Sequence, residues 1–329
     1  MPDFSDIVGH EKIKEHLQNA IRLGKISHAY ILDGEEGMGK RMLASAFAKA
    51  LQCEKGGGLP CGRCRSCLQA ESGNHPDIIY VTHEKPASVG VNDIRAGLCD
   101  DILIRPYAGP WKIYIVDEAE KMTVQAQNAL LKTIEEPPAY GIILLLSTNS
   151  ELFLPTVLSR CVTLKLRPVG GVLVKRYLME NEKVPDYQAE TIAAFSGGNI
   201  GRAKRLTQSG DFLQLKDEVI ALLSGIDWID AADISDAVAE MAQKRAFIDD
   251  YLDVMTLWFR DVLLFKATRD ADGLIFQDRL NDITKRAEKS SYEGLQNIME
   301  ALGKAQDRLK ANVNFEITME LLLLTIKEN

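Results

Sequence analysis

Residues 34–42, GEEGMGKRM, have the composition and spacing of a phosphate-binding loop. Such a loop needs glycines whose backbone N–H groups converge on phosphate oxygens, and a lysine that reaches the outer phosphates. These residues are Gly34, Gly37, Gly39 and Lys40. The pattern fails at Arg41, where a serine or threonine hydroxyl would bind magnesium. A guanidinium cannot coordinate a cation, so we expect a fossil or regulatory pocket, in which ATP or ADP can bind but hydrolysis is weak or absent.

An acidic pair follows a second apolar run, in IYIVDEAE. In a hydrolysing site of this kind, Asp117 would stand near the metal at the carboxyl end of a strand, and Glu118 would orient the attacking water. An Asp-Glu pair on its own is more typical of a solvated turn. Downstream of a phosphate loop the pair is specific, and the sequence therefore predicts a degenerate nucleotide site.

Four cysteines lie in one short stretch, CEKGGGLPCGRCRSC. They are Cys53, Cys61, Cys64 and Cys67. Glycine-containing turns let close thiolates converge on a tetrahedral zinc ion, and disulfides are disfavoured in a reducing cytoplasm. Redox chemistry or unrelated thiols are the alternative. Four thiolates leave no open coordination position, so the zinc is expected to be structural. Cys99 and Cys161 are left over, and we expect both to be buried.

The elements that position these residues alternate between apolar runs and helical patterns, as parallel α/β units do. The five strand candidates are residues 29–33, 77–82, 112–117, 142–147 and 161–166. They show little polar alternation, which favours a sheet covered on both faces. Helices are predicted after the phosphate loop and over the segment that ends before Pro137. The fold class is therefore α/β, with a phosphate loop after the first strand of a five-stranded parallel sheet.

The strand signal fades after residue 171, and the remaining sequence is almost wholly helical in pattern. We divide the chain into a core over residues 1–167, a small helical lid over 168–209 and an all-helical domain over 210–329. The cysteine stretch, 53–67, is an insertion in the core.

The composition sets limits on function. A chain of 329 residues with 46% hydrophobic and 26% charged residues is ordinary for a soluble globular protein of two or three domains. Its apolar runs are too short to span a bilayer and no secretory signal is visible, so we expect a cytoplasmic protein without membrane contact. The net charge of −8 argues against a broad DNA-binding face, because such faces carry a basic excess.

Taken together, these features resemble the AAA+ clamp-loader ATPases of bacterial DNA polymerase III, over nearly the whole chain. The motifs are FSDIVGHEKIKEHLQNAI, the phosphate loop, the cysteine insertion, HPD, VDEAEKMTVQAQNALLKTIEEPP, STNS, LSRC, WFRDVLL and NVNFEITMELLLL. The resemblance implies an AAA+ core, a lid and a C-terminal collar. It also implies gamma/tau and delta clamp-loader subunits as partners, with the sliding clamp and primer-template DNA contacted through the assembled complex.

The Ser-Arg-Cys motif of this family lies at a subunit interface. The resemblance implies that Arg160 projects into the nucleotide site of a neighbouring ATPase subunit, where a guanidinium stabilises charge on the transferring phosphoryl group. The alternative is a surface arginine near the start of a strand.

Two departures separate this chain from a hydrolysing member of the family. One is Arg41. The other lies in SGGNIGRA, where Gly201 fills the slot of the second sensor arginine relative to Gly198, and Arg202 follows one position later. On a helix that shift turns a side chain by about 100°. The departures favour a non-hydrolysing subunit, as does the end of the sequence at residue 329 without a tau-type extension. The alternatives are an active gamma/tau-like motor and an unrelated zinc-dependent DNA-binding module.

Overall fold

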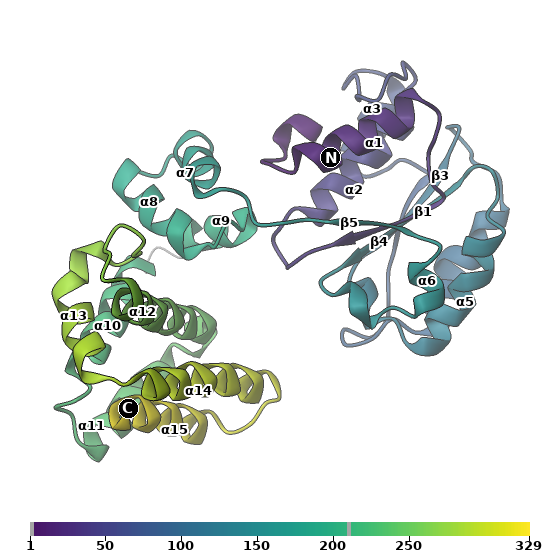
Figure 1. Ribbon diagram of the computed structural model, residues 1–329. Helices are drawn as coiled ribbons and strands as arrows, with labels where there is room; N and C mark the ends of the chain where they lie inside the picture. The colour runs from purple at the N-terminus through teal and green to yellow at the C-terminus, as the bar shows by residue number, and fades with distance from the viewer. Residues whose placement is uncertain (1–2, 209–211) are drawn as a thin grey trace. The chain divides into compact units, whose positions relative to one another are not determined.

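A computed structural model describes residues 3–208 and 212–329. The chain forms two compact units, shown in Figure 1. Residues up to Tyr177, together with Gly197–Arg202, belong to the first unit, whereas Leu178–Ser196 and the residues from Ala203 onward belong to the second. The predicted boundary between lid and collar, at 209–210, lies outside the described residues. The division into three domains therefore stays a prediction.

Within the described residues, five parallel strands form one sheet in the order β2-β3-β4-β1-β5. The strands are β1 (Ala29–Asp33), β2 (Ile78–Val81), β3 (Lys112–Val116), β4 (Gly141–Ser147) and β5 (Val162–Lys165). They agree with the five predicted segments to within one or two residues at each end. Strands β3 and β4 are buried along their whole length, which explains their lack of alternation. The predicted α/β fold class is confirmed.

Helices cover both faces of the sheet (Figure 1). The helices of the first unit are α1 (Glu11–Arg22), α2 (Lys40–Leu51), α3 (Arg65–Glu71), α4 (Val91–Ile94), α5 (Val124–Glu135) and α6 (Pro155–Leu158), and it shares α7 (Gly171–Glu180) and α9 (Ile200–Gln208) with the second. On one face Leu17 and Phe47 pack with Tyr30 and Leu144. On the other, helices α4 to α6 contribute Ile94, Leu130, Ile134 and Val157. Alternate residues of β1 to β4 contribute to these two cores, as strand geometry requires.

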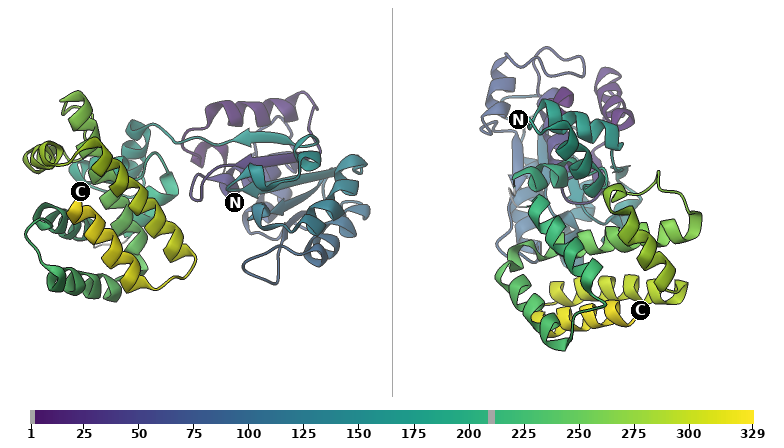
Figure 2. Two further views of the ribbon diagram at one scale, coloured as in Figure 1. Left: turned by 60° about the horizontal axis from the view of Figure 1, so that its bottom comes forward. Right: turned by 90° about the vertical axis from the view of Figure 1, so that its left-hand side faces the viewer.

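The described part of the second unit is helical. Beyond its shares of α7 and α9 it contains α8 (Asp186–Phe195), α10 (Phe212–Gly225), α11 (Ala231–Gln243), α12 (Ile248–Thr268), α13 (Leu280–Lys289), α14 (Tyr292–Lys310) and α15 (Phe315–Glu328). Helices α14 and α15 lie side by side, as Figure 2 shows. The core is aromatic: Phe276 makes edge-to-face contacts with Phe195 and Trp258 at ring separations of 5.3 Å. Such pairs add to the free energy gained from burial alone.

Two of the motifs quoted for the C-terminal region serve this packing. Asp261, in WFRDVLL, is fully buried and accepts hydrogen bonds from the N–H groups of Ile275 and Phe276 at 2.6 and 2.9 Å. Asn314 caps α15 by accepting a hydrogen bond from the N–H of Ile317 at 2.9 Å. No helix of the described chain has both the length and the apolar character of a membrane span.

Candidate nucleotide site, cysteine cluster and surface arginine

The phosphate loop connects β1 to α2, as predicted. Gly34 donates its N–H to the carbonyl of Ser147 at 3.0 Å, which ties the start of the loop to β4. Gly37 and Gly39 have φ values of 84° and 89°, a conformation that favours glycine. Lys40 is largely buried, and its Nζ donates to the carbonyl oxygens of Gly34 and Glu35 at 2.5 and 2.9 Å. Burial lowers the pKa of Lys40, against the opposing effect of nearby carboxylates.

Arg41 lies beside the acidic residue that would hold magnesium in a hydrolysing site. Its Nη1 is 3.8 Å from Oδ2 of Asp117, and its guanidinium stands 5.2 Å from the ring centre of Tyr80. The side chains of Arg41 and Asp117 are 69% and 45% exposed, so this ion pair contributes little to stability. Its importance is chemical, because it brings a positive charge near the Asp117 carboxylate.

Glu118 sits in a left-handed turn, with φ of 50°. Its carboxylate pairs with Lys121 at 2.6 Å and lies 3.5 Å from Nε2 of His83. The hydrogen bond from Lys121 lowers the pKa of Glu118. The residue predicted to orient a water molecule is thus engaged with Lys121 and His83 of its own chain.

Glu120 is a residue of this pocket that the sequence analysis missed. Its Oε1 accepts a hydrogen bond from the hydroxyl of Thr148, in the STNS motif, at 2.7 Å. Its Oε2 is buried and has no hydrogen-bond partner among the described residues. Among the nearby carboxylates, Glu120 has the largest effect in raising the pKa of Lys40, against the effect of burial. The third acid in DEAE was the available signal: a negative group stands close to the phosphate-binding lysine.

The start of α9 packs directly onto the phosphate loop. The N–H of Gly201 donates to the carbonyl of Gly37 at 2.9 Å, and Nδ2 of the buried Asn199 donates to the carbonyl of Glu36 at 2.7 Å. A Cβ atom at position 201 would lie 2.5 Å from Cα of Gly37. In this structure, therefore, any side chain in the slot of the sensor arginine would collide with the loop backbone.

The four predicted metal ligands come together. The sulfur atoms of Cys53, Cys61, Cys64 and Cys67 all lie within 4.8 Å of one another. A zinc tetrahedron with Zn–S bonds of about 2.3 Å has S–S edges of roughly 3.8 Å, so a small inward movement of the thiolates would complete it. The donor set fits a zinc ion, and the cluster could bind a metal.

Local structure shapes this cluster. Cys64 caps α3, and its sulfur accepts a hydrogen bond from the N–H of Cys67 at 3.3 Å. Backbone hydrogen bonds from Arg63 and Cys64 lower the pKa of the Cys61 thiol to about 6. Burial raises the pKa of the Cys67 thiol to about 12. A dication would favour the thiolate at both positions, because it stabilises negative sulfur.

Cys99 and Cys161 lie outside this cluster, and the expectation that both are buried was wrong in degree. Each is partly exposed. They sit at the edge of the core that covers one face of the sheet, packed against it rather than within it. Desolvation raises the pKa of the Cys161 thiol to about 12.

Arg160 lies on the surface, just after α6. Its Nη1 donates to the carbonyl of Thr156 at 3.0 Å and to Oγ of Ser159 at 3.2 Å, and its Nη2 is 2.9 Å from Oε1 of Glu135. The side chain is 39% exposed.

The HPD motif has a structural role. Asp77 is fully buried, and its carboxylate accepts hydrogen bonds from the N–H groups of Tyr107, Ala108 and Gly109 at 2.7, 2.7 and 2.9 Å. Nε2 of His75 and Oγ of Ser66 form a hydrogen bond of 3.0 Å, which links the start of β2 to α3. These contacts fix the loop before β3 rather than forming a reactive site.

The strand order, the loop between β1 and α2 and the acidic pair after β3 define an AAA+ P-loop protein. The family profile described as DNA polymerase III, delta subunit matches residues 9–170, and that of its C-terminal region matches residues 213–328. The chain is 31% identical to DNA polymerase III subunit delta' of Bacillus subtilis (strain 168) over 320 residues, 96% of each chain. It belongs to the delta' family of clamp-loader subunits.

Other similarities are more distant. Subunit tau of the same strain is 28% identical over 346 residues, which cover 98% of this chain and 61% of tau. A solved structure of a gamma subunit-related protein from Thermotoga maritima overlaps 96% of this chain and 98% of its own, with 19% identity and a TM-score of 0.44. That TM-score marks a loose overlap.

Proposed function

We propose that this chain is a clamp-loader subunit that does not hydrolyse ATP in its own pocket and that supplies Arg160 to the nucleotide site of a neighbouring ATPase subunit. One observation carries the proposal: the guanidinium of Arg41 pairs with Asp117 in the seat that magnesium would need. Magnesium normally neutralises charge on the β- and γ-phosphates during transfer. Arg41 removes the hydroxyl ligand and also brings a competing positive charge near the second metal-binding group, Asp117.

Two further contacts support the same conclusion. The negative charge of Glu120 interacts with Lys40, and its carboxylate accepts a hydrogen bond from the hydroxyl of Thr148. A bound γ-phosphate would meet this negative charge. Gly201 rests on Gly37 where a sensor arginine would otherwise extend. The degenerate site of Gly34, Gly37, Gly39, Lys40, Asp117 and Glu118 therefore holds ATP or ADP weakly at most.

The surface position of Arg160 supports a role in trans. It lies on the surface of the first unit, beside the end of α5, and its side chain keeps 39% of its area exposed. A guanidinium supplied by a neighbour is worth about three to five orders of magnitude in phosphoryl transfer. Lysine would not replace it, because an ammonium lacks the planar fork that binds two oxygens.

The four-cysteine cluster is proposed to hold one structural zinc ion. Cys53, Cys61, Cys64 and Cys67 supply the complete donor set, and the surrounding segment has little regular structure of its own apart from α3. A metal would hold this insertion together, as in small zinc-dependent modules.

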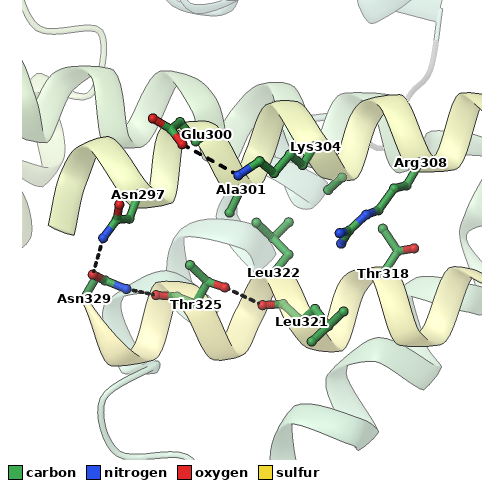
Figure 3. Close-up of a pocket in the computed structure, with 11 residues that line it drawn as sticks. Asn297, Glu300, Ala301, Lys304, Arg308, Thr318, Leu321, Leu322, Thr325 and Asn329 are labelled. Atoms are coloured by element: carbon green, nitrogen blue, oxygen red, sulfur yellow. Dashed lines mark hydrogen bonds and ion pairs between the residues drawn. The ribbon is translucent and has the colours of Figure 1, made fainter. Parts of the chain in front are cut away.

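The partners proposed are gamma/tau and delta subunits, with the sliding clamp and primer-template DNA reached through the assembled complex in the cytoplasm. The second unit would form the collar. On α15 the exposed side chains of Ile317, Leu321 and Leu324 follow one another at helical spacing and form an apolar stripe. Leu321 also lines a groove of about 400 Å³ between α14 and α15, shown in Figure 3. The net charge of −8 favours DNA contact through partners.

The decisive experiment measures ATP turnover by the isolated chain and by the complex reconstituted with its motor subunit. We expect no turnover by the isolated chain. In the complex, Arg160→Ala should slow turnover by at least about a hundredfold at the site it serves. Arg105→Ala, which changes an exposed arginine in the same unit, should have no effect. Unchanged turnover in Arg160→Ala would remove the proposed role.

An active gamma/tau-like motor is the second candidate, favoured by the 28% identity to tau along 98% of this chain. Turnover by the purified chain that is lost in Lys40→Ala would establish it and would overturn the first proposal. Salt-dependent DNA binding by the isolated chain would instead indicate a DNA-binding module.

A further inference from the structure

The guanidinium of Arg160 is braced on two sides by its own chain. On one side, Nη1 contacts the carbonyl of Thr156, in α6, and the hydroxyl of Ser159, which directly follows α6. On the other, Nη2 meets the carboxylate of Glu135, the last residue of α5, at 2.9 Å. The guanidinium thus contacts residues at the C-terminal ends of both α5 and α6.

Glu135 occupies a place where a carboxylate is unfavourable by itself. The carbonyl end of a helix carries partial negative charge, so an acidic side chain in the last turn is repelled by the helix dipole. Glu136 follows directly and adds a second negative charge. A cation beside Glu135 offsets this repulsion, and Arg160 supplies it.

This bracing leaves part of the guanidinium available. Arginine has five N–H donors in a rigid fork. Two of them hydrogen-bond to Thr156 and Ser159, and Nη2 forms the ion pair with Glu135. Because 39% of the side chain is exposed, an anionic oxygen can reach the guanidinium while the Glu135 pair stays intact.

We infer that Glu135 is a positioning residue for Arg160. It holds the guanidinium in one arrangement before a neighbour's phosphates arrive, so that little reorganisation is needed during transfer. Without Glu135 the long arginine side chain samples other rotamers, and the geometry at the phosphoryl group is lost part of the time. The inference rests on the proposed function of Arg160.

The test uses Glu135→Gln in the complex reconstituted with the motor subunit, with ATP as the substrate. We expect kcat to fall by about two- to fivefold, the range that loss of a half-exposed ion pair supports, while KM for ATP stays the same. Glu136→Gln is the matched control, since it removes an adjacent charge and spares the Arg160 contact. It should leave kcat unchanged. A Glu135→Gln complex that is faster than wild type would show that Glu135 restrains Arg160, and would overturn the inference.

A double-mutant cycle separates positioning from a general structural role. In an Arg160→Ala background, Glu135→Gln should cause no further loss, because the residue through which it acts is gone. A further loss of the same size would overturn the inference. If Arg160→Ala is itself without effect, the proposed function fails. If Arg160→Ala slows turnover but Glu135→Gln matches wild type, only the positioning role fails.

Discussion

Replacing Gly201 with alanine tests the packing of α9 on the phosphate loop. An added methyl carbon would lie 2.5 Å from Cα, 2.7 Å from the carbonyl oxygen and 3.0 Å from the carbonyl carbon of Gly37. All three are backbone atoms, so no side-chain rotation relieves the collision. Either the loop or the helix must shift, and the hydrogen bond between the two residues is then strained or lost.

The size of the effect follows from two opposing terms. Alanine in place of a helical glycine stabilises by about 0.5–1 kcal/mol, because the unfolded chain loses freedom. Overpacking against a fixed backbone costs about 1–3 kcal/mol. Loss of the hydrogen bond adds about 0.5–1.5 kcal/mol. The net expectation is that Gly201→Ala destabilises this contact by roughly 1–3 kcal/mol.

The matched control is Gly303→Ala, inside α14, where nothing lies within 4 Å of the added carbon. This variant should be stabilised by about 0.5–1 kcal/mol. Urea denaturation gives the two midpoints, and hydrogen exchange of the amides in residues 34–40 reports the loop directly. The Gly201 variant should exchange faster there. If both glycine variants gained stability alike and the loop amides kept their protection, the proposed collision would be refuted.

Three further predictions address other sites. Glu120→Gln removes the negative charge beside Lys40, so binding of a fluorescent ADP analogue should tighten by about three- to tenfold; weaker or equal binding would contradict the electrostatic argument. Asp77→Ala leaves three backbone N–H groups of the loop before β3 without their acceptor and should lower the free energy of unfolding by about 3–5 kcal/mol, measured by urea denaturation. Metal analysis should find one zinc per chain, and Cys64→Ser should release it and make the insertion more sensitive to protease; metal-free wild-type protein would refute this.

The sheet could be predicted because its strands are buried on both faces. Nearly continuous runs of Ile, Val and Leu, as in β4, indicate buried strands when helical segments separate them along the chain. The four cysteines could be predicted as a cluster because their spacing is short and the ligands are local. In both cases the information lies within a few residues of sequence.

The rest depends on contacts between distant segments. The sequence shows that Arg41 replaces the hydroxyl that would bind magnesium. Its pairing with Asp117, however, depends on the side-chain arrangement of two separate loops. The contact of Gly201 with Gly37 joins positions far apart in the chain, and only the folded backbone shows that no side chain fits there. The ion pair of Glu135 with Arg160 is equally non-local. Glu120 was overlooked because an acid beside the expected pair is common in solvated turns.

The order of the strands has a consequence for how the protein is made. The first strand to leave the ribosome, β1, is paired in the finished sheet with β4 and β5, so that Ala29 aligns with Ile143 and Tyr30 with Val162. Until β4 and β5 have been synthesised, β1 lacks the strands with which it pairs, and the glycine loop after it is not held in place. Contacts this distant in sequence form slowly, and until they form the unpaired strand edges are exposed and prone to aggregation. Nascent chains that stop between β1 and β5 should therefore depend on chaperones, whereas the helical second unit can form largely from neighbouring segments.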